Sequence, residues 1–173
     1  MRQNLARYAL NAPIPLTAVA TTDQTATTVT LGRFKGQGVA LYFGHTYCPD
    51  LCLATPTQLT RVKKRLGPQG QRLRVVFVSM DPQRDKPERM RTYLSNFDSS
   101  FVGMTGSPQE VTAITQHHGV SYEVQGPQQT DASLIARSGY AYLLDRQGTA
   151  RNLFPLDAAL EVLVRRDQAL QYS

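Results

Sequence analysis

The sequence predicts one α/β domain with a central mixed β-sheet flanked by helices, and three observations lead to this fold class. The apolar run of residues 39–43 is typical of a central strand covered on both faces. Helix-like and strand-like segments alternate after it, which favours parallel strands. A hairpin pattern over residues 140–154 then adds antiparallel strands. The 173 residues suffice for one core, and we expect residues 1–14 to be an N-terminal arm and residues 15–173 the domain.

The segments before the central strand predict a small extension of the sheet. Residues 1–13 have weak periodicity and are expected to form an extended arm. Residues 16–20 and 27–31 are short and rich in Thr and Val, and the residues between them at 21–24 are polar. This pattern predicts an N-terminal antiparallel β-hairpin.

Two helices are predicted in the middle of the chain, with a strand at residues 73–80 between them. The first follows residue 52 and ends at Gly67. The residues predicted on its apolar face are Leu59, Val62 and Leu66. Asp85 is expected to be the N-cap of the second, with Glu88 completing a capping box. The residues predicted on the apolar face of this second helix are Met90, Tyr93, Leu94 and Phe97.

A third helix is predicted after a short strand at residues 101–104. Ser107 and Glu110, with a proline directly after the serine, form a strong capping-box signal. The residues expected on its apolar face are Val111, Ile114 and His118, and Gly119 ends it. We therefore expect His118 to be a core histidine with one nitrogen hydrogen-bonded, and His117 to be exposed.

The last third of the chain predicts further sheet and one more helix. A strand at residues 120–124 is followed by a polar loop at 125–131. The hairpin strands are expected at residues 140–144 and 149–154, and a final helix at about 157–170.

Composition excludes several classes of protein. The chain carries 19 basic and 13 acidic residues, giving a net charge of +6, but the basic residues are scattered and no aromatic residues interleave with them. We therefore expect no nucleic-acid partner. No apolar run is long enough to span a bilayer, and the N-terminus lacks the apolar core of a signal peptide. The protein is thus expected to be cytoplasmic or to follow a removed signal or anchor.

The two cysteines, Cys48 and Cys52, lie together between the predicted central strand and a helix. Loops at the carboxyl ends of such strands commonly carry function. A helix N-terminus favours thiolate over thiol. We therefore expect a reactive dithiol, able to form a short-loop disulfide or to bind a soft metal, with Asp50 tuning it or fixing the turn.

Residues 43–52, FGHTYCPDLC, resemble the signature of the Sco/SenC family. Further matches follow in order and at the expected distances, at residues 78–88, 101–106, 119–122 and 142–148. The resemblance covers about residues 15–170. It implies a thioredoxin-like fold and a membrane-anchored, extracytoplasmic copper metallochaperone that assists the assembly of cytochrome oxidase. The implied partner is a copper-site subunit of an oxidase or another copper protein, and we expect a monomer tethered to a membrane in its full-length form, with the signal or anchor absent from this sequence.

The resemblance also implies a copper site made of both cysteines and one distant histidine. This chain has Arg137 where the family pattern has that histidine. A guanidinium has no free lone pair, so it is not a metal ligand. Arg137 would instead stabilise a thiolate at Cys48 or Cys52 and repel a metal cation, unless it faces solvent. The expected catalytic and metal-binding residues are therefore Cys48 and Cys52.

His45 is the alternative histidine ligand, or else a hydrogen-bonding residue. It stands where the family usually has Tyr, and Tyr47 stands where the family usually has His. Residues two apart share a face of a strand, so the two side chains are expected to point the same way. Asp81 and Arg84 follow another strand end and are expected to support the site as a salt bridge or a docking spot.

Four functions remain open from the sequence. The leading one is a copper-handling protein of the Sco/SenC type, in which a reduced dithiol binds Cu(I) or reduces the disulfide of a copper site. The alternative is an extracytoplasmic thiol–disulfide oxidoreductase without copper, because Arg137 replaces the histidine. A thiol peroxidase and a non-catalytic binding module are the remaining two.

Overall fold

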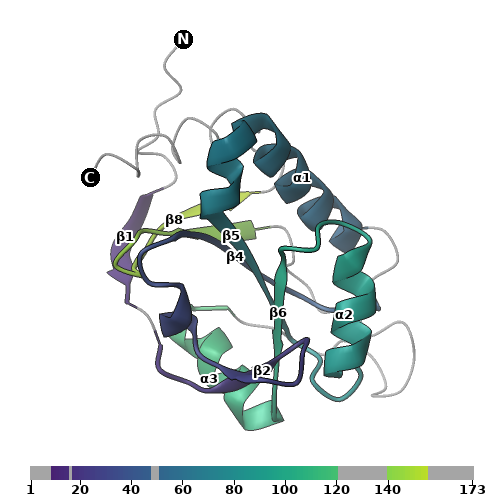
Figure 1. Cartoon of the computed structure of the whole chain (residues 1–173). Helices are drawn as coiled ribbons and strands as arrows, with labels where there is room; N and C mark the ends of the chain where they lie inside the picture. The colour runs from purple at the N-terminus through teal and green to yellow at the C-terminus, as the bar shows by residue number, and fades with distance from the viewer. Residues whose placement is uncertain (1–8, 16, 48–50, 121–139, 156–173) are drawn as a thin grey trace.

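The computed structural model describes residues 9–15, 17–47, 51–120 and 140–155, which form a mixed eight-stranded sheet with helices on both faces (Figure 1). The strand order is β1-β8-β7-β4-β5-β6-β2-β3. The predicted fold class is therefore confirmed. Among the helices of these residues, none is long and apolar enough to cross a membrane.

The three strands β4, β5 and β6 are parallel, and the predicted hairpin adds two antiparallel strands on the other side of β4. β4 (Gly38–Gly44) pairs in parallel with β5 (Leu73–Ser79), and β5 pairs in parallel with β6 (Val102–Thr105). On the other side of β4, β7 (Tyr140–Leu144) is antiparallel to it, and β8 (Ala150–Pro155) is antiparallel to β7. The apolar run at residues 39–43 thus forms the buried central strand, as its lack of polar residues predicted.

The hairpin near the N-terminus is present, but its first strand lies later than predicted. β2 (Thr21–Asp23) and β3 (Thr28–Val29) are antiparallel, and β2 extends the sheet beside β6. The reason is the Asp23 carboxylate, which accepts hydrogen bonds from the backbone N–H groups of Thr25 and Thr27 at 2.8 and 3.1 Å. The turn is tight, with Ala26 at a φ of 62°, so β2 ends at Asp23 and β3 begins at Thr28.

Part of the expected N-terminal arm also joins the sheet. β1 (Ala9–Ile14) pairs antiparallel with β8 and forms one edge. Leu10 and Ile14 pack against the core, and the weak periodicity of this segment gave no sign of that pairing. At the opposite edge lies the short strand β3.

Helices cover both faces of the sheet and divide the core in two. α1 (Leu51–Leu66) and α2 (Pro87–Ser95) pack on one face, and α3 (Pro108–His117) packs on the other (Figure 1). The predicted apolar faces are confirmed, since their large side chains are buried or packed against the core. Short 3₁₀ segments at Leu31–Phe34 and Gly67–Arg72 complete the packing.

The helix ends show one correct and one wrong prediction. Ser107 and Glu110 form the predicted capping box, in which the Ser107 hydroxyl accepts from the Glu110 N–H and the Glu110 carboxylate accepts from the Ser107 N–H. The N-cap of α2 is Lys86, not Asp85, and it makes no side-chain cap. The strand predicted at residues 120–124, the loop at 125–131 and the final helix at 157–170 fall almost wholly outside the described residues.

Candidate dithiol site at the carboxyl end of the central strand

The dithiol segment connects the end of β4 at Gly44 to the start of α1 at Leu51. Cys52 is the second residue of that helix, although its side chain is outside the description. Cys48 and Asp50 lie outside the described residues. Because β4 ends at Gly44 and α1 begins at Leu51, the predicted place of the segment, between the central strand and a helix N-terminus, is confirmed. The free N–H groups and partial positive charge of that helix end favour the thiolate form of a nearby cysteine.

His45, the first residue after β4, is buried, with 2% of its surface exposed. Neither ring nitrogen has a hydrogen-bond partner among the residues that the structure describes. Burial lowers the pKa of His45 below its ordinary value of 6.5, and the Asp85 carboxylate only partly opposes this effect. The imidazole is therefore neutral at pH 7 and keeps one nitrogen lone pair free.

Tyr47 does not share the orientation of His45, so the expectation that both point the same way is wrong. His45 is buried, whereas the Tyr47 side chain is 39% exposed. The alternation of a strand no longer applies, because β4 ends at Gly44 and a turn begins at Thr46.

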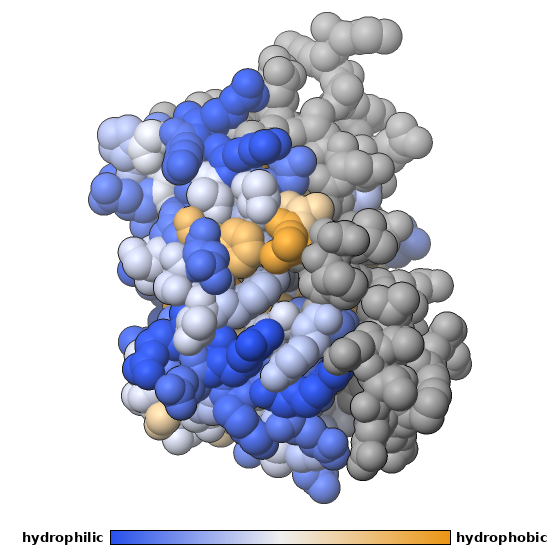
Figure 2. Space-filling model, turned by 90° about the vertical axis from the view of Figure 1, so that its right-hand side faces the viewer, coloured by the Kyte–Doolittle hydropathy of each residue, from blue (hydrophilic) through white to orange (hydrophobic). Residues whose placement is uncertain are grey.

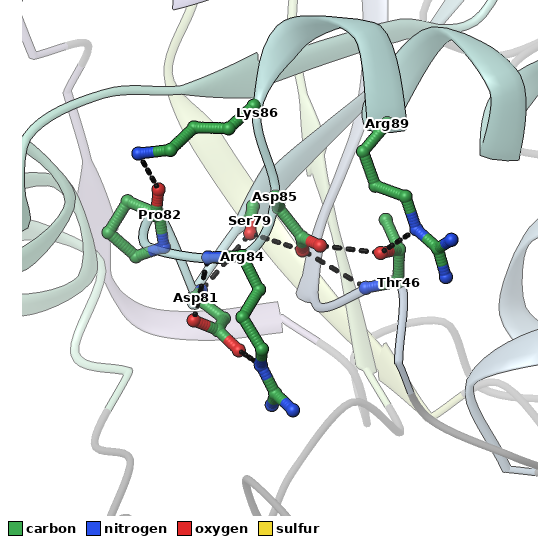
Figure 3. Close-up of polar contacts among 8 residues, drawn as sticks. All are labelled: Thr46, Ser79, Asp81, Pro82, Arg84, Asp85, Lys86 and Arg89. Atoms are coloured by element: carbon green, nitrogen blue, oxygen red, sulfur yellow. Dashed lines mark hydrogen bonds and ion pairs between the residues drawn. The ribbon is translucent and has the colours of Figure 1, made fainter. Parts of the chain in front are cut away.

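The turn at Thr46 is held by a buried carboxylate from another part of the chain (Figure 3). Asp85 is fully buried and accepts hydrogen bonds from the Thr46 N–H at 3.0 Å and from the Thr46 hydroxyl at 2.5 Å. The Ser79 hydroxyl, at the end of β5, donates to the same carboxylate at 2.6 Å. These three bonds explain why Asp85 does not cap α2: its side chain turns inward to the end of the sheet.

Two arginines flank the turn on its outer side. Arg84 forms the predicted ion pair with Asp81 through its Nε. Arg89, in α2, donates from Nε to the Thr46 hydroxyl at 3.0 Å (Figure 3). The guanidinium carbons of Arg84 and Arg89 lie 4.7 and 4.3 Å from the centre of the Tyr47 ring, within cation–π range.

Sequence reasoning missed Arg89 and the true role of Asp85. The available signal was topological: parallel strands end at the same edge of a sheet, so the segment after β5 must meet the segment after β4. That rule places residues 79–89 beside Thr46, but it does not say which of their side chains turn inward.

Arg137 lies outside the described residues, so its expected position facing the dithiol stays a prediction. The strand that follows it, β7, begins at Tyr140 and runs antiparallel to β4, with Tyr42 opposite Ala141. The chain therefore enters β7 at the end of the sheet where β4 leaves it.

The other two histidines have the predicted surroundings: His118 lies in the core and His117 at the surface. His118 is 1% exposed, and its Nδ1 lies 2.9 Å from the Ile114 carbonyl oxygen. Its Nε2 has no partner in the described part of the chain, and burial lowers its pKa. His117 is exposed. Among the described residues, no three His, Cys, Asp or Glu side chains are grouped so that they could hold a metal. The side chains of Cys48 and Cys52 are not among these residues, because they lie outside the description.

Comparison with known proteins places the chain in a family. The SCO1/SenC family model matches residues 17–170. A SCO2-like protein of Rickettsia conorii is 30% identical over 138 residues, covering 79% of this chain and 67% of the relative.

Two solved structures share the fold. The apo Sco1 solution structure from Thermus thermophilus is 33% identical, with a TM-score of 0.82 and 94% of each chain covered. The copper-bound ScoI of Bradyrhizobium japonicum is 28% identical, with a TM-score of 0.81, covering 90% of this chain and 99% of that one. The predicted thioredoxin-like fold is thus confirmed, and the chain belongs to the SCO1/SenC family.

Proposed function

We propose that this protein binds copper through Cys48 and Cys52 and delivers it to a copper site of a cytochrome oxidase. The observation that carries the proposal is the CxxxC dithiol at a strand-to-helix turn in a chain of the SCO1/SenC family. The similar ScoI of Bradyrhizobium japonicum has been solved with copper bound. Thiolate sulfurs are the ligands that Cu(I) prefers in proteins.

His45 is the proposed third ligand. Its imidazole is buried and neutral at pH 7, and both nitrogens lack a partner among the described residues. A buried nitrogen without a hydrogen bond is costly unless some group satisfies it. Two thiolates and one neutral imidazole make a donor set that fits Cu(I). Arg137, at the histidine position of the family pattern, has no lone pair to offer.

The remaining residues hold and tune the dithiol. The N-terminus of α1 stabilises the thiolate form of Cys52, which lies in the first turn of that helix. Asp85 fixes Thr46 two residues before Cys48, so the start of the loop is anchored to the ends of β4 and β5. Asp81 and Arg84 form the adjoining ion pair. For Asp50, which lies outside the described residues, we propose that it tunes the cysteines or fixes the turn.

Copper loading needs the reduced dithiol, because a disulfide has no thiolate to offer. Oxidation of Cys48 and Cys52 to a disulfide, with loss of two electrons and two protons to an external disulfide, would therefore block loading. The expected setting is extracytoplasmic, with a monomeric domain tethered to a membrane.

The test is an anaerobic titration of the reduced protein with Cu(I) against a competing chelator. Tight one-to-one binding in the wild type, with no tight binding in Cys48→Ser, supports the proposal. His117→Gln is the matched histidine control, because His117 is exposed, and it should bind like the wild type. Absence of tight binding in the wild type, together with fast thiol–disulfide exchange, would instead identify an oxidoreductase without copper.

A further inference from the structure

Tyr47, the residue directly before Cys48, forms a compact group with the exposed Arg89 and the half-buried Arg84, and we call this group the arginine–tyrosine clamp. Both guanidinium groups lie against the Tyr47 ring, at 4.7 Å for Arg84 and 4.3 Å for Arg89. Tyr47 is 39% exposed, one of two large hydrophobic side chains that are exposed among the described residues. The clamp is therefore accessible, and its tyrosine is next to the dithiol in the sequence.

The two arginines are fixed by bonds from their inner nitrogens. Arg84 uses Nε for Asp81, and Arg89 uses Nε for the Thr46 hydroxyl (Figure 3). No hydrogen bond from the terminal nitrogens of either guanidinium is present within the described ranges. Each arginine is thus oriented by the protein while its outer donors stay available.

Within the described ranges, no carboxylate beside the clamp accepts a hydrogen bond from these outer donors. Asp85 is fully buried, and its oxygens already accept from Thr46 and Ser79. The Asp81 side chain is 14% exposed and faces Arg84 Nε. Asp81 is paired with Arg84 and Glu88 is exposed in the first turn of α2, so Arg89 is the arginine of the clamp without an ion-pair partner among the described residues.

We propose that the arginine–tyrosine clamp recognises an acidic segment of the protein partner that reacts with the dithiol. Guanidinium forks bind carboxylates with two parallel hydrogen bonds, and an orienting contact lowers the entropy lost on binding. Arg and Tyr are among the residue types enriched at protein–protein interfaces and their hot spots. The inference rests on the proposed function, because the clamp would present the partner to Cys48 and Cys52.

A protein partner fits this surface better than a small anion. An anion alone would use only the guanidinium groups, whereas the exposed Tyr47 ring and the exposed Leu53 in the first turn of α1 offer apolar contact. Figure 2 shows the side of the molecule that is on the right in Figure 1, where a small hydrophobic group lies within a largely hydrophilic surface. A small apolar centre with a charged surround is the usual anatomy of a protein interface.

The first test uses three synthetic peptides of equal length, each with one cysteine activated as a 2-pyridyl disulfide and flanked by Glu, Gln or Lys. A cysteine thiolate of the reduced protein attacks the peptide sulfur, a new S–S bond forms, and the old one breaks. Pyridine-2-thiolate leaves, takes a proton and is measured by its absorbance. At low ionic strength we expect the Glu peptide to react about tenfold faster than the Gln peptide, with the preference lost at high salt.

Variants assign the preference to the clamp. Arg89→Gln and Arg84→Gln should each remove most of the rate ratio between Glu and Gln peptides, a ratio that cancels any change in thiolate reactivity. Arg91→Gln is the matched control, because Arg91 lies on the same helix, is exposed and carries the same charge. It should keep the ratio. An equal loss in Arg91→Gln, or equal rates for all peptides in the wild type, would overturn the proposal.

A binding assay separates this proposal from the dithiol chemistry. Fluorescent Glu and Gln peptides with Ser in place of Cys are titrated with the protein, and anisotropy reports binding without any reaction. Tighter binding of the Glu peptide to the wild type and to Arg91→Gln than to Arg89→Gln supports the clamp even if the dithiol proves unreactive. Equal binding of both peptides to the wild type refutes it even if copper binding is tight.

Discussion

Two buried histidines lie on this fold in different surroundings, and the difference between them points to the site. His118 ends α3 and packs against the rings of Phe43 and Tyr142, with Nδ1 bonded to the Ile114 carbonyl. His45 is equally buried at the end of β4, but neither of its nitrogens has a partner among the described residues. Burial lowers the pKa of both.

The comparison contrasts a histidine that is bonded within the core with the histidine that we propose as a copper ligand. One ring nitrogen of His118 is hydrogen-bonded to the Ile114 carbonyl of its own helix, so this bond needs no contact with a distant part of the chain. At His45 the described structure supplies no such bond, although the Asp85 network fixes the very next residue, Thr46. A side chain buried without a partner at the end of a central strand is suited to a ligand that arrives later.

The largest expected effect concerns the thiolates on which the role of His45 depends. Cys48→Ser and Cys52→Ser should each weaken Cu(I) binding by about a thousandfold or more, because a hydroxyl is a poor ligand for a soft cation. Neither change should lower the free energy of unfolding of the reduced protein by more than about 1 kcal/mol, because the reduced protein has no disulfide between these residues to lose. Chelator competition and urea unfolding measure the two effects. Copper binding that survives both changes would place the metal elsewhere.

A large effect on stability is expected at the carboxylate beside His45. Asp85→Asn should lower the free energy of unfolding by about 3 kcal/mol, because the amide nitrogen cannot accept the hydrogen bonds that Thr46 and Ser79 donate. The control is Glu88→Gln, at an exposed carboxylate in the first turn of α2. Urea unfolding of both variants gives the difference. Equal, small losses would mean that the network does not hold the turn.

Replacement of each histidine by phenylalanine should have different effects on Cu(I) affinity. His45→Phe should weaken Cu(I) affinity by about ten- to a hundredfold, the range typical of disturbed metal sites. His118→Phe should leave the affinity unchanged, because that side chain lies in the core against Phe43 and Tyr142. Near-ultraviolet circular dichroism checks that both variants are folded. A loss of affinity in His118→Phe with none in His45→Phe would reverse the assignment.

A smaller effect is expected in the pH dependence of stability. The pKa of His118 is lowered in the folded state, so below its ordinary value of 6.5 the unfolded chain binds more protons than the folded one. The free energy of unfolding of the metal-free protein should therefore be level above pH 6.5 and fall between pH 6.5 and 5. The fall should be shallower in His118→Phe than in the wild type. A slope that is the same in both proteins would contradict this origin.

Local signals in the sequence were sufficient for much of the fold. The capping box at Ser107 formed as predicted, because its two partners lie three residues apart and need nothing from the rest of the chain. The central strand and the closing hairpin also followed from apolar runs and turn residues. The N-terminal hairpin was displaced because Asp23 sets a tighter turn than the Thr-rich pattern indicated.

The site was less predictable, because its contacts join distant parts of the sequence. Asp85 has the local pattern of an N-cap, yet its carboxylate bonds to Thr46, 39 residues earlier. The opposite exposures of His45 and Tyr47 depend on where β4 stops, which a period-two pattern does not reveal. Such contacts follow from the meeting of parallel strand ends, so they emerge only once the register of the sheet is known.

The most direct test of the copper site is X-ray absorption spectroscopy at the copper edge of the Cu(I)-loaded protein. Two sulfur ligands and one imidazole nitrogen are expected in the wild type and in His118→Phe, and two sulfur ligands without the imidazole in His45→Phe. An imidazole signal that persists in His45→Phe, or a copper ion bound by sulfur alone in the wild type, would contradict the assignment of His45 as the third ligand.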